Sequence, residues 1–506
     1  MIVENLEITK ENYKDVCKKL SLPYCFFENT FSNRKIELPD HAGFYDIETE
    51  NDESFLFGFV NNRKFTDPQE MLQYLQQFPV ICGFNSYRFD NRILFSLCPG
   101  MFTKKTINRF DIFLVDGPIN IDMLPFYQLW KPFKASHKLD YLARDLGIER
   151  KFSLENKEQK CQEDAEITKA FYPHTRQIAL WIYKNFQIDP SYLSSMPSFQ
   201  FSKLRRWMLQ IYLLKHGILP ELMRKDSKKE PHYFTYCKRG FYKNINAFDI
   251  KSAYPTTAIK LNCSLYKEGD FASFLKFLIE ERKNNPQIQE TIKWVCNAII
   301  GDMNCTDGIL YDKSIMADVW NTFKTEMEKW IKATGKKNVI YSYTDCIFTP
   351  LNEVPKMEGY EVSLKHRLEW IAVFNITRIL GLNENGKIHR THFNRVPAQL
   401  KMYDYIEAEI DKTLKENPIK FLNMPHNPID IKSLPEDAFK IVIRKDGNTC
   451  TNIDYLRIWP KLSFGFNEIF FTDKGSITTD PSKIGYIHYQ KLLNNYLRLY
   501  RMKVKP

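Results

Sequence analysis

Two aspartates at the ends of apolar strand patterns constrain this chain more than any other feature. Asp345 lies in YSYTDC, residues 341–346, between the apolar runs NVI and IFTP, an order typical of a strand, a tight turn and a second strand. Asp249 follows the apolar strand NINAF and precedes a turn that ends at Pro255. The acids are 96 residues apart, so they can meet only if their strands are neighbours in one sheet. The alternative, that each is an ordinary turn residue, stays open.

The residues between the two aspartates supply cations. If the carboxylates converge, they could bridge two Mg²⁺ ions about 3.5–4 Å apart, the arrangement used for in-line phosphoryl or nucleotidyl displacement. The intervening segment reads as a helical hairpin on which Lys293 and Asn297, four residues apart, share a face, while Arg282 lies on the preceding helix. A lysine and an arginine on two antiparallel helices can bind a triphosphate. The alternative is an ordinary solvated helix face.

Composition narrows the class of protein. Lys plus Arg exceed Asp plus Glu by 72 − 61 = 11 among 506 residues, which suits a polyanionic partner, although many basic proteins bind none. The 11 cysteines include no CxxC pair and no Cys/His cluster, which predicts free thiols in a reducing compartment. No apolar run approaches the ~18 residues of a transmembrane helix, and the N-terminal residues lack a signal-peptide pattern. We therefore expect a cytoplasmic protein without membrane contact.

The alternation of strand-like and helix-like runs predicts an α/β multidomain protein. Such runs alternate in the first third, a helical and then polar stretch follows, and a second mixed region surrounds the two aspartates. Beyond about residue 376 the chain reads as helical and basic. The predicted segments are a leader, 1–40; a first α/β domain, 41–175; a connector, 176–240; a split mixed domain, 241–262 and 302–375; the helical hairpin, 263–301; and a C-terminal region, 376–506.

The first α/β domain carries its own set of acids. Asp46 and Glu48 in YDIETE are two residues apart on a predicted strand and therefore lie on one face. NSYRFD supplies Asn85 and Asp90, and CQEDAEIT places Asp164 on a predicted helix. A DxE pattern alone often arises by chance, so these positions are informative only together.

Three of these segments, in this order, resemble the motifs of family B DNA polymerases. DIKSAYP is similar to DxxSLYP, KWVCNAIIG to KxxxNxxYG, and YSYTDC to YxDTDS. The acids of the first domain resemble the three motifs of the DEDD 3′–5′ exonucleases that precede such polymerases. The resemblance covers nearly the whole chain. It implies an RNase H-like exonuclease domain followed by a right-hand polymerase, with palm (241–262 and 302–375), fingers (263–301) and thumb (376–506).

The resemblance implies a role for each matching residue. The catalytic carboxylates, each binding metal, would be Asp249 and Asp345 for synthesis, and Asp46, Glu48, Asp90 and Asp164 for proofreading. The residues that bind the incoming dNTP would be Arg282, Lys293, Asn297, Tyr254, Ser252 and Ala253. The residues that contact primer or DNA would be Asn85, Lys160, Arg378, Lys401 and Tyr403. Tyr254 would lie beneath the sugar and exclude a 2′-hydroxyl. The metal would be Mg²⁺, two ions per site, with Mn²⁺ as a substitute.

Ala253 for Leu is a minor departure from the family pattern, and three other departures bear on the chemistry. Tyr343 stands where the first Asp of DTD is expected, although Asp345, the direct ligand, is kept. Ile300 replaces the Tyr of the second motif. Lys160 replaces the Tyr that orients the attacking water, and a protonated lysine cannot act as a base. We therefore predict a nuclease that is present but weakened.

Spacing and the C-terminal residues indicate the subtype. Only 44 residues separate Asp249 from Lys293, and 48 separate Asn297 from Asp345. The protein-primed phage polymerases, which the compact N-terminal end resembles, carry insertions in these intervals, and this chain has no room for substantial ones. The resemblance implies a reduced polymerase of a virus or other mobile element, without grounds for strand displacement or high processivity. FNITRILGL, with Arg378, and LKMY both remain candidates for the segment that holds the primer end.

The expected function is template-directed DNA synthesis. A primer 3′-hydroxyl would attack the α-phosphate of a dNTP while two Mg²⁺ ions neutralise the developing charge. We expect a monomer that binds primer-template DNA, with no accessory factor indicated. The alternative is a catalytically silent polymerase fold that acts as a nucleic-acid-binding scaffold. The substitutions at Lys160, Ile300 and Tyr343 motivate it, and the retained polymerase-site residues argue against it.

Overall fold

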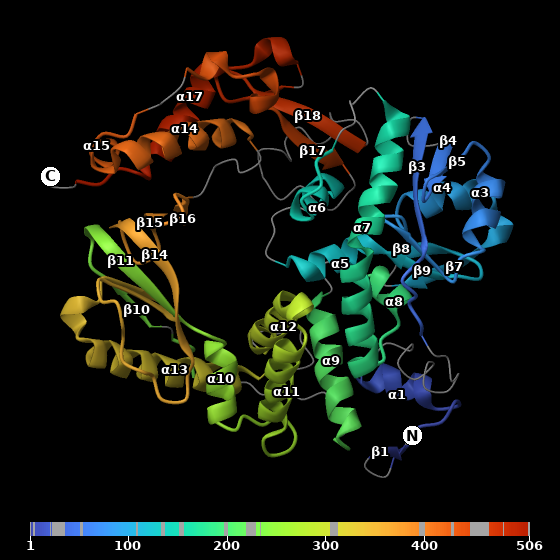
Figure 1. Cartoon of the computed structure of the whole chain (residues 1–506), viewed down its shortest axis with the longest axis horizontal. Coiled ribbons are helices and arrows are strands. Elements are labelled where there is room, and N and C mark those ends of the chain that lie inside the picture. Colours follow the sequence, from blue (N-terminus) through green and yellow to red (C-terminus); the bar gives the residue numbers. More distant parts are fainter. Residues whose placement is uncertain are drawn as a thin grey trace. The chain divides into compact units, whose positions relative to one another are not determined.

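The chain divides into two compact units. The computed structural model describes residues 2–3, 6–20, 22, 36–50, 54–107, 110–132, 137–150, 156–196, 201–218, 229–232, 234–303, 312–393, 400–426, 430–445, 465–478 and 480–503. Unit 1 comprises Met1–His232 and Ser252–Phe323, and unit 2 comprises Tyr233–Lys251 and Lys324–Pro506. Figure 1 labels many of their elements and colours the chain from its N-terminus to its C-terminus. The finer division into six segments stays a prediction.

Unit 1 contains a five-stranded mixed sheet in the order β5-β4-β3-β6-β9. The strands are β3 (Gly43–Glu50), β4 (Ser54–Val60), β5 (Arg63–Phe65), β6 (Val80–Gly83) and β9 (Ile119–Asp122). β3 and β4 form the predicted antiparallel hairpin, and β6 runs parallel to β3 and β9. Tyr45 and Ile47 point into the core, so Asp46 and Glu48, with the opposite parity, share the other face.

A long helix covers the acid-bearing face of this sheet. Helix α7 (Lys157–Phe186) packs Cys161 and Ala165 against Phe59, which lies opposite Asp46 in the β3–β4 ladder. The other elements of this region are β1 (Ile2–Val3), β2 (Leu6–Glu7), α1 (Tyr13–Leu20), α3 (Pro68–Leu75), α4 (Asp90–Leu97), β7 (Phe102–Ile107), β8 (Phe110–Val115), α5 (Met123–Trp130), α6 (Leu139–Asp145) and α8 (Pro190–Ser194). Helix α1 falls within the predicted leader and buries Cys17 and Leu20 in the core.

The rest of unit 1 is helical and contains the predicted hairpin. It consists of α11 (Asp270–Asn284) and α12 (Gln289–Asp302), joined through a short 3₁₀ turn at Pro286–Ile288. The apolar face of α12 is buried, so its polar positions face outward. Three further helices complete the region: α9 (Phe201–Lys215), α10 (Ala253–Lys260) and α13 (Lys313–Thr334), which ends in unit 2.

Unit 2 is built on a seven-stranded sheet in the order β10-β12-β13-β11-β14-β15-β16. Its strands are β10 (Thr235–Cys237), β11 (Gly240–Ile250), β12 (Tyr341–Tyr343), β13 (Cys346–Thr349), β14 (Val362–Val373), β15 (Ile379–Asn383) and β16 (Ile388–Thr391). β11 is central and pairs antiparallel with both β13 and β14. The strand-turn-strand pattern predicted around Asp345 is confirmed as β12 and β13.

The C-terminal region is less helical than predicted. β15 and β16 lie beyond residue 376 and extend the central sheet, because Ile379, Leu380 and Leu382 are buried there. A three-stranded sheet, β17 (Ile441–Lys445), β18 (Gly465–Phe471) and β19 (Ile477–Thr478), also lies in this region. The α-helices described in this region are α14 (Met402–Glu416), α15 (Pro418–Asn423) and α17 (Tyr486–Arg498). In the described residues, no helix is both long and apolar enough to span a bilayer.

Candidate active sites

The structure brings Asp249 and Asp345 to the same edge of the unit 2 sheet. In the β11–β13 ladder Asp249 lies opposite Cys346, the residue after Asp345. The backbone N–H of Ile250 donates to the carbonyl oxygen of Asp345 at 3.0 Å. The adjacency expected from the strand patterns is therefore confirmed, and it comes from strand pairing between segments 96 residues apart.

The turn that presents Asp345 is strained. Thr344 has φ 56°, a left-handed conformation that is rare for a β-branched residue. Its hydroxyl lies 2.8 Å from Asp345 Oδ1, and its N–H donates to the carbonyl of Phe234 at 3.1 Å. Burial raises the pKa of Asp345, and the charge of Asp249 raises it further. The strained turn therefore holds Asp345 beside a second carboxylate, and a nearby cation stabilises such a pair.

A lysine that sequence reasoning missed completes this group. Lys365 Nζ lies 3.1 Å from Asp249 Oδ1. In the β11–β14 ladder Ala247 pairs with His366 and Phe248 with Leu364, so Lys365 is the extra residue of a β-bulge. A bulge redirects a side chain that regular alternation would place elsewhere. The printed sequence holds no local signal for it, because the bulge exists only once β11 and β14 pair.

The residues expected to bind the dNTP sugar and phosphates belong to unit 1, where the structure connects Arg282 to the segment 252–254. Ser252 precedes α10 with φ 50°, and Arg282 Nη1 donates to its hydroxyl at 3.0 Å. The next residue, Ala253, is buried. The Tyr254 ring stacks on Trp320 with ring centroids 4.8 Å apart, which fixes the plane of the ring. The first turn of α10 is therefore a rigid element tied to α11.

Helix α12 presents its two predicted polar residues outward. Asn297 is exposed and Lys293 is half-buried, with its ammonium 3.9 Å from Glu290. The end of the helix is held by Arg205 of α9, which makes a bidentate pair of 2.7 Å bonds with Asp302. Helix α12 therefore has an exposed polar face and an anchored apolar face.

In unit 1 the structure also gathers Asp46, Asp90 and Asp164 from three separate elements. Burial raises the pKa of Asp46, and the charges of Asp90 and Asp164 raise it further. Burial raises the pKa of Asp164 to about 6. Asp90, 3% exposed, keeps its Oδ2 without a hydrogen-bond partner among the described residues. Clustered buried carboxylates of this kind favour a cation.

Two cations already contact this acid cluster. Lys160 forms an ion pair with Glu48 and lies 3.8 Å from Asp164. Burial acts to lower the pKa of Lys160, but the hydrogen bond with Glu48 and the nearby carboxylates raise it overall. Arg150, which sequence reasoning missed, also pairs with Asp164. Both lysine and arginine therefore compensate negative charge inside the cluster.

A further buried acid shapes the loop beside the cluster. Asp122 accepts from the N–H groups of Asn85 at 2.8 Å and Tyr87 at 3.2 Å. Burial raises the pKa of Asp122 to about 6. Asn85 itself is left-handed, with φ 59°. Asp122 therefore holds the loop that contains Asn85 and leads to Asp90. Sequence reasoning missed this residue, because it belongs to no motif.

The donor atoms fit Mg²⁺, but their present arrangement is that of an ion-pair network. Within the described ranges, no three acidic, imidazole or thiol side chains are grouped to enclose one metal ion. Carboxylate oxygens are the ligands Mg²⁺ prefers, and one or two of them suffice when substrate phosphates supply the others. Asp249 with Asp345, and Asp46 with Asp90, meet that condition. The Oδ2 atom of Asp90, which has no hydrogen-bond partner among the described residues, is available as a metal ligand.

The predicted primer-contacting residues of unit 2 are Arg378, Lys401 and Tyr403, and their surroundings differ. Tyr403 is 1% exposed in the core of unit 2, so its ring cannot reach a nucleic acid. Lys401 pairs with Asp437 at 2.5 Å. Arg378 lies in the turn before β15, with its guanidinium 5.3 Å from the Phe374 ring. The burial of Tyr403 argues against LKMY as a segment that grips the primer.

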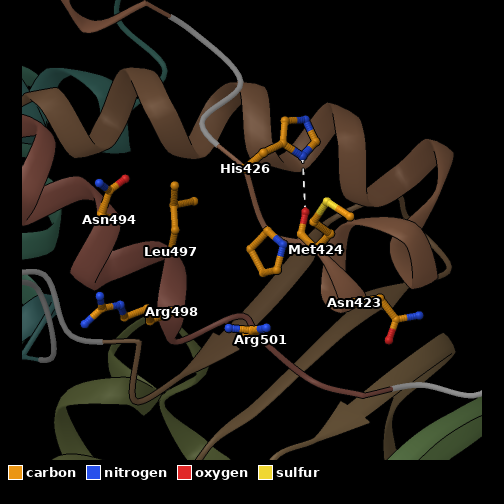
Figure 2. Close-up of a pocket in the computed structure, with 8 residues that line it drawn as sticks. Asn423, Met424, His426, Asn494, Leu497, Arg498 and Arg501 are labelled. Carbon is orange, nitrogen blue, oxygen red and sulfur yellow. Dashed lines mark hydrogen bonds between the residues drawn. The ribbon is translucent and has the colours of Figure 1, made fainter.

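A basic pocket lies between α15 and α17 in unit 2. It has a volume of about 270 Å³ and is lined by Asn423, Met424, Pro425, His426, Asn494, Leu497, Arg498 and Arg501. Figure 2 shows Asn494, Leu497 and Arg498 on one side, and Met424 and His426 across from them. No lining residue is acidic, and no described acid pairs with Arg498 or Arg501. Two unpaired guanidinium groups make this pocket a candidate phosphate contact.

The comparisons with known proteins support the fold and not the detailed function. No protein-family model matches, and no curated protein matches. Among solved structures, the chain is similar to the family B DNA polymerase from the hyperthermophilic archaeon Pyrobaculum calidifontis. The TM-score is 0.63 at 16% identity, over 94% of this chain and 80% of that chain. This chain therefore has a mixed α/β multidomain fold similar to that of a family B DNA polymerase.

Proposed function

We propose that this chain is a DNA-directed DNA polymerase that also carries a 3′–5′ exonuclease. The observation that carries the proposal is the adjacency of Asp249 and Asp345, in a fold similar to that of a family B polymerase. The substrates are dNTPs and a DNA primer-template, and the metal is Mg²⁺, with Mn²⁺ as a substitute. The compact motif spacing supports a viral or mobile-element type.

In DNA synthesis the carboxylates of unit 2 and the cations of unit 1 would have distinct roles. Asp249 and Asp345 would hold the metal ions, which when bound supply positive charge at the attacking and leaving oxygens. Arg282 would grip the triphosphate through its fork, and Lys293 would act as a point charge. Tyr254 would exclude a 2′-hydroxyl, because its stacking partner Trp320 keeps the ring from turning away.

The nuclease site would use the acid cluster of unit 1. Asp46, Glu48, Asp90 and Asp164 would hold the metals that activate water and stabilise the leaving oxygen. Lys160 cannot take a proton from water while it is protonated, and its pKa is raised. This supports digestion that is slower than in enzymes with a tyrosine at this position.

The C-terminal region would hold duplex DNA through its phosphates. Arg498 and Arg501 line a pocket without acidic residues, and contacts of this kind carry no sequence information. A net charge of +11 adds a general attraction to the polyanion.

Primer extension and primer degradation with Mg²⁺ test both activities together. We expect Asp345→Ala to abolish extension and keep degradation, and Asp46→Ala to do the reverse. Asp318→Ala is the matched control, because this half-exposed aspartate pairs with a surface lysine, Lys229. A wild-type protein that folds but extends no primer would rule out the polymerase proposal.

The ion pairs inside both acid clusters favour one alternative function. Lys365 on Asp249 and Lys160 on Glu48 could mark a polymerase fold that binds nucleic acid without catalysis. In that case wild type would bind primer-template DNA but neither extend nor degrade it, with or without Mn²⁺.

A further inference from the structure

We infer that Lys160 is a built-in counter-cation of the acid cluster, which a divalent ion must displace before it can bind there. The inference deepens the proposed nuclease and rests on it for the identity of the metal ligands. It concerns the competition between an ammonium group of the chain and a metal ion for the same carboxylates.

The contacts of Lys160 place its charge among the acids. Its ammonium pairs with Glu48 from β3 and lies 3.8 Å from Asp164, one turn further along α7. Both carboxylates are nearly inaccessible, with side chains 13% and 10% exposed. The charge of Lys160 also acts on Asp46 and Asp90. It lowers the pKa of each, although burial raises both pKa values by more. One lysine thus interacts with all four acids.

The cluster still has one carboxylate oxygen that is available as a metal ligand. The Oδ2 atom of Asp90 is buried and has no hydrogen-bond partner in the described part of the chain. An ammonium group carries a single positive charge, so it neutralises neighbouring carboxylates less fully than a divalent ion does. The cluster therefore keeps a carboxylate oxygen available for a metal ion, while Lys160 offsets part of its negative charge.

The side chain can leave the cluster. Lys160 is 38% exposed and has a flexible four-carbon stem, so its ammonium can move into water. Arg150, the other cation, is only 14% exposed and pairs with two acids, Asp164 and Asp140. Of these two cations, Lys160 is thus the one that a metal ion can displace. A metal ion must break its pair with Glu48, which lowers metal affinity at this site.

The nearby pair of Lys64 and Glu158 provides a matched control. It also joins the sheet to α7, but its side chains are 37% and 53% exposed. No hydrogen bond or ion pair in the described part of the chain joins either residue to the cluster acids. Removing that lysine changes an ordinary surface pair, whereas removing Lys160 changes the charge inside the cluster.

The test is Mn²⁺ binding by isothermal titration calorimetry. All variants carry Asp249→Ala and Asp345→Ala, so that binding reports on the nuclease cluster. We expect Lys160→Met to bind Mn²⁺ about tenfold more tightly, the factor that corresponds to ~1.4 kcal/mol. Lys64→Met should bind as the parent does, and adding Asp46→Asn to Lys160→Met should remove the gain.

Two outcomes overturn the inference: unchanged or weaker Mn²⁺ binding by Lys160→Met, or an equal gain in Lys64→Met. Lys160→Gln serves as a second variant if the methionine variant fails to fold by circular dichroism. Degradation of a mismatched primer separates this inference from the proposed function. Tighter binding without any degradation supports the role of Lys160 and refutes the nuclease; degradation with unchanged binding does the opposite.

Discussion

The buried ion pair between Arg205 and Asp302 yields a prediction with a calculable size. The pair is bidentate at 2.7 Å, its side chains are 10% and 9% exposed, and the guanidinium also lies 4.4 Å from the Trp294 ring. Arg205→Met would leave the carboxylate buried without a partner. Breaking such a pair costs about 3–5 kcal/mol.

Protonation of the unpaired carboxylate sets an upper limit on the loss of unfolding free energy. An unpaired buried carboxylate can take up a proton, and for an ordinary aspartic acid this costs about 4 kcal/mol at pH 7 and about 1.5 kcal/mol at pH 5. The folded variant then binds one proton more than its unfolded chain, so its deficit relative to wild type shrinks as pH falls. We expect Arg205→Met to lose ~4 kcal/mol of unfolding free energy at pH 7 and less than half of that at pH 5.

Equilibrium urea unfolding at the two pH values measures this difference. Combining Arg205→Met with Asp302→Leu should recover most of the loss, because both charges are then gone. Lys229→Met, which breaks an exposed pair in the same unit, should cost no more than about 1 kcal/mol. A loss below ~1 kcal/mol at pH 7, or one that does not change with pH, would contradict the reasoning.

Three further predictions concern function. Lys365→Met should lower the Mg²⁺ concentration for half-maximal primer extension, because the carboxylate it pairs with becomes fully available; a higher requirement would show that the lysine assists metal binding. Tyr254→Ala should raise the incorporation of ribonucleotides relative to deoxynucleotides, and Trp320→Leu should do so to a smaller extent by loosening the ring; competition assays would show neither effect if the ring does not contact the sugar. Arg498→Ala and Arg501→Ala should each lower the slope of log Kd against log salt for primer-template binding by about one; unchanged slopes would remove this pocket from the DNA interface.

Local sequence was sufficient to predict features that depend on a single strand or helix. The alternation in YDIETE predicted that Asp46 and Glu48 share a face, and β3 shows it. The helical hairpin and the strands around Asp345 were also predicted, because their apolar periodicity is strong. The helical character expected beyond residue 376 was wrong in part, since β15 owes its strand structure to pairing with β14.

Residues that act through long-range contacts could not be found in this way. Lys365 reaches Asp249 only because a bulge forms when β11 pairs with β14. Arg150 has no motif, and its contact with Asp164 depends on how α7 packs. Tyr403 fitted a motif, but the core of unit 2 buries it.

The amino-acid sequence by itself determined which residues carry charge, on which face of each strand or helix they lie, and in which order the acids and cations follow. These properties depend on periods of two and 3.6 residues, which are local. Tertiary structure alone decided which charges neutralise one another, because an ion pair depends on distance and burial between segments that can be a hundred residues apart. In this chain, tertiary packing places a lysine beside each of the two sets of catalytic carboxylates proposed above.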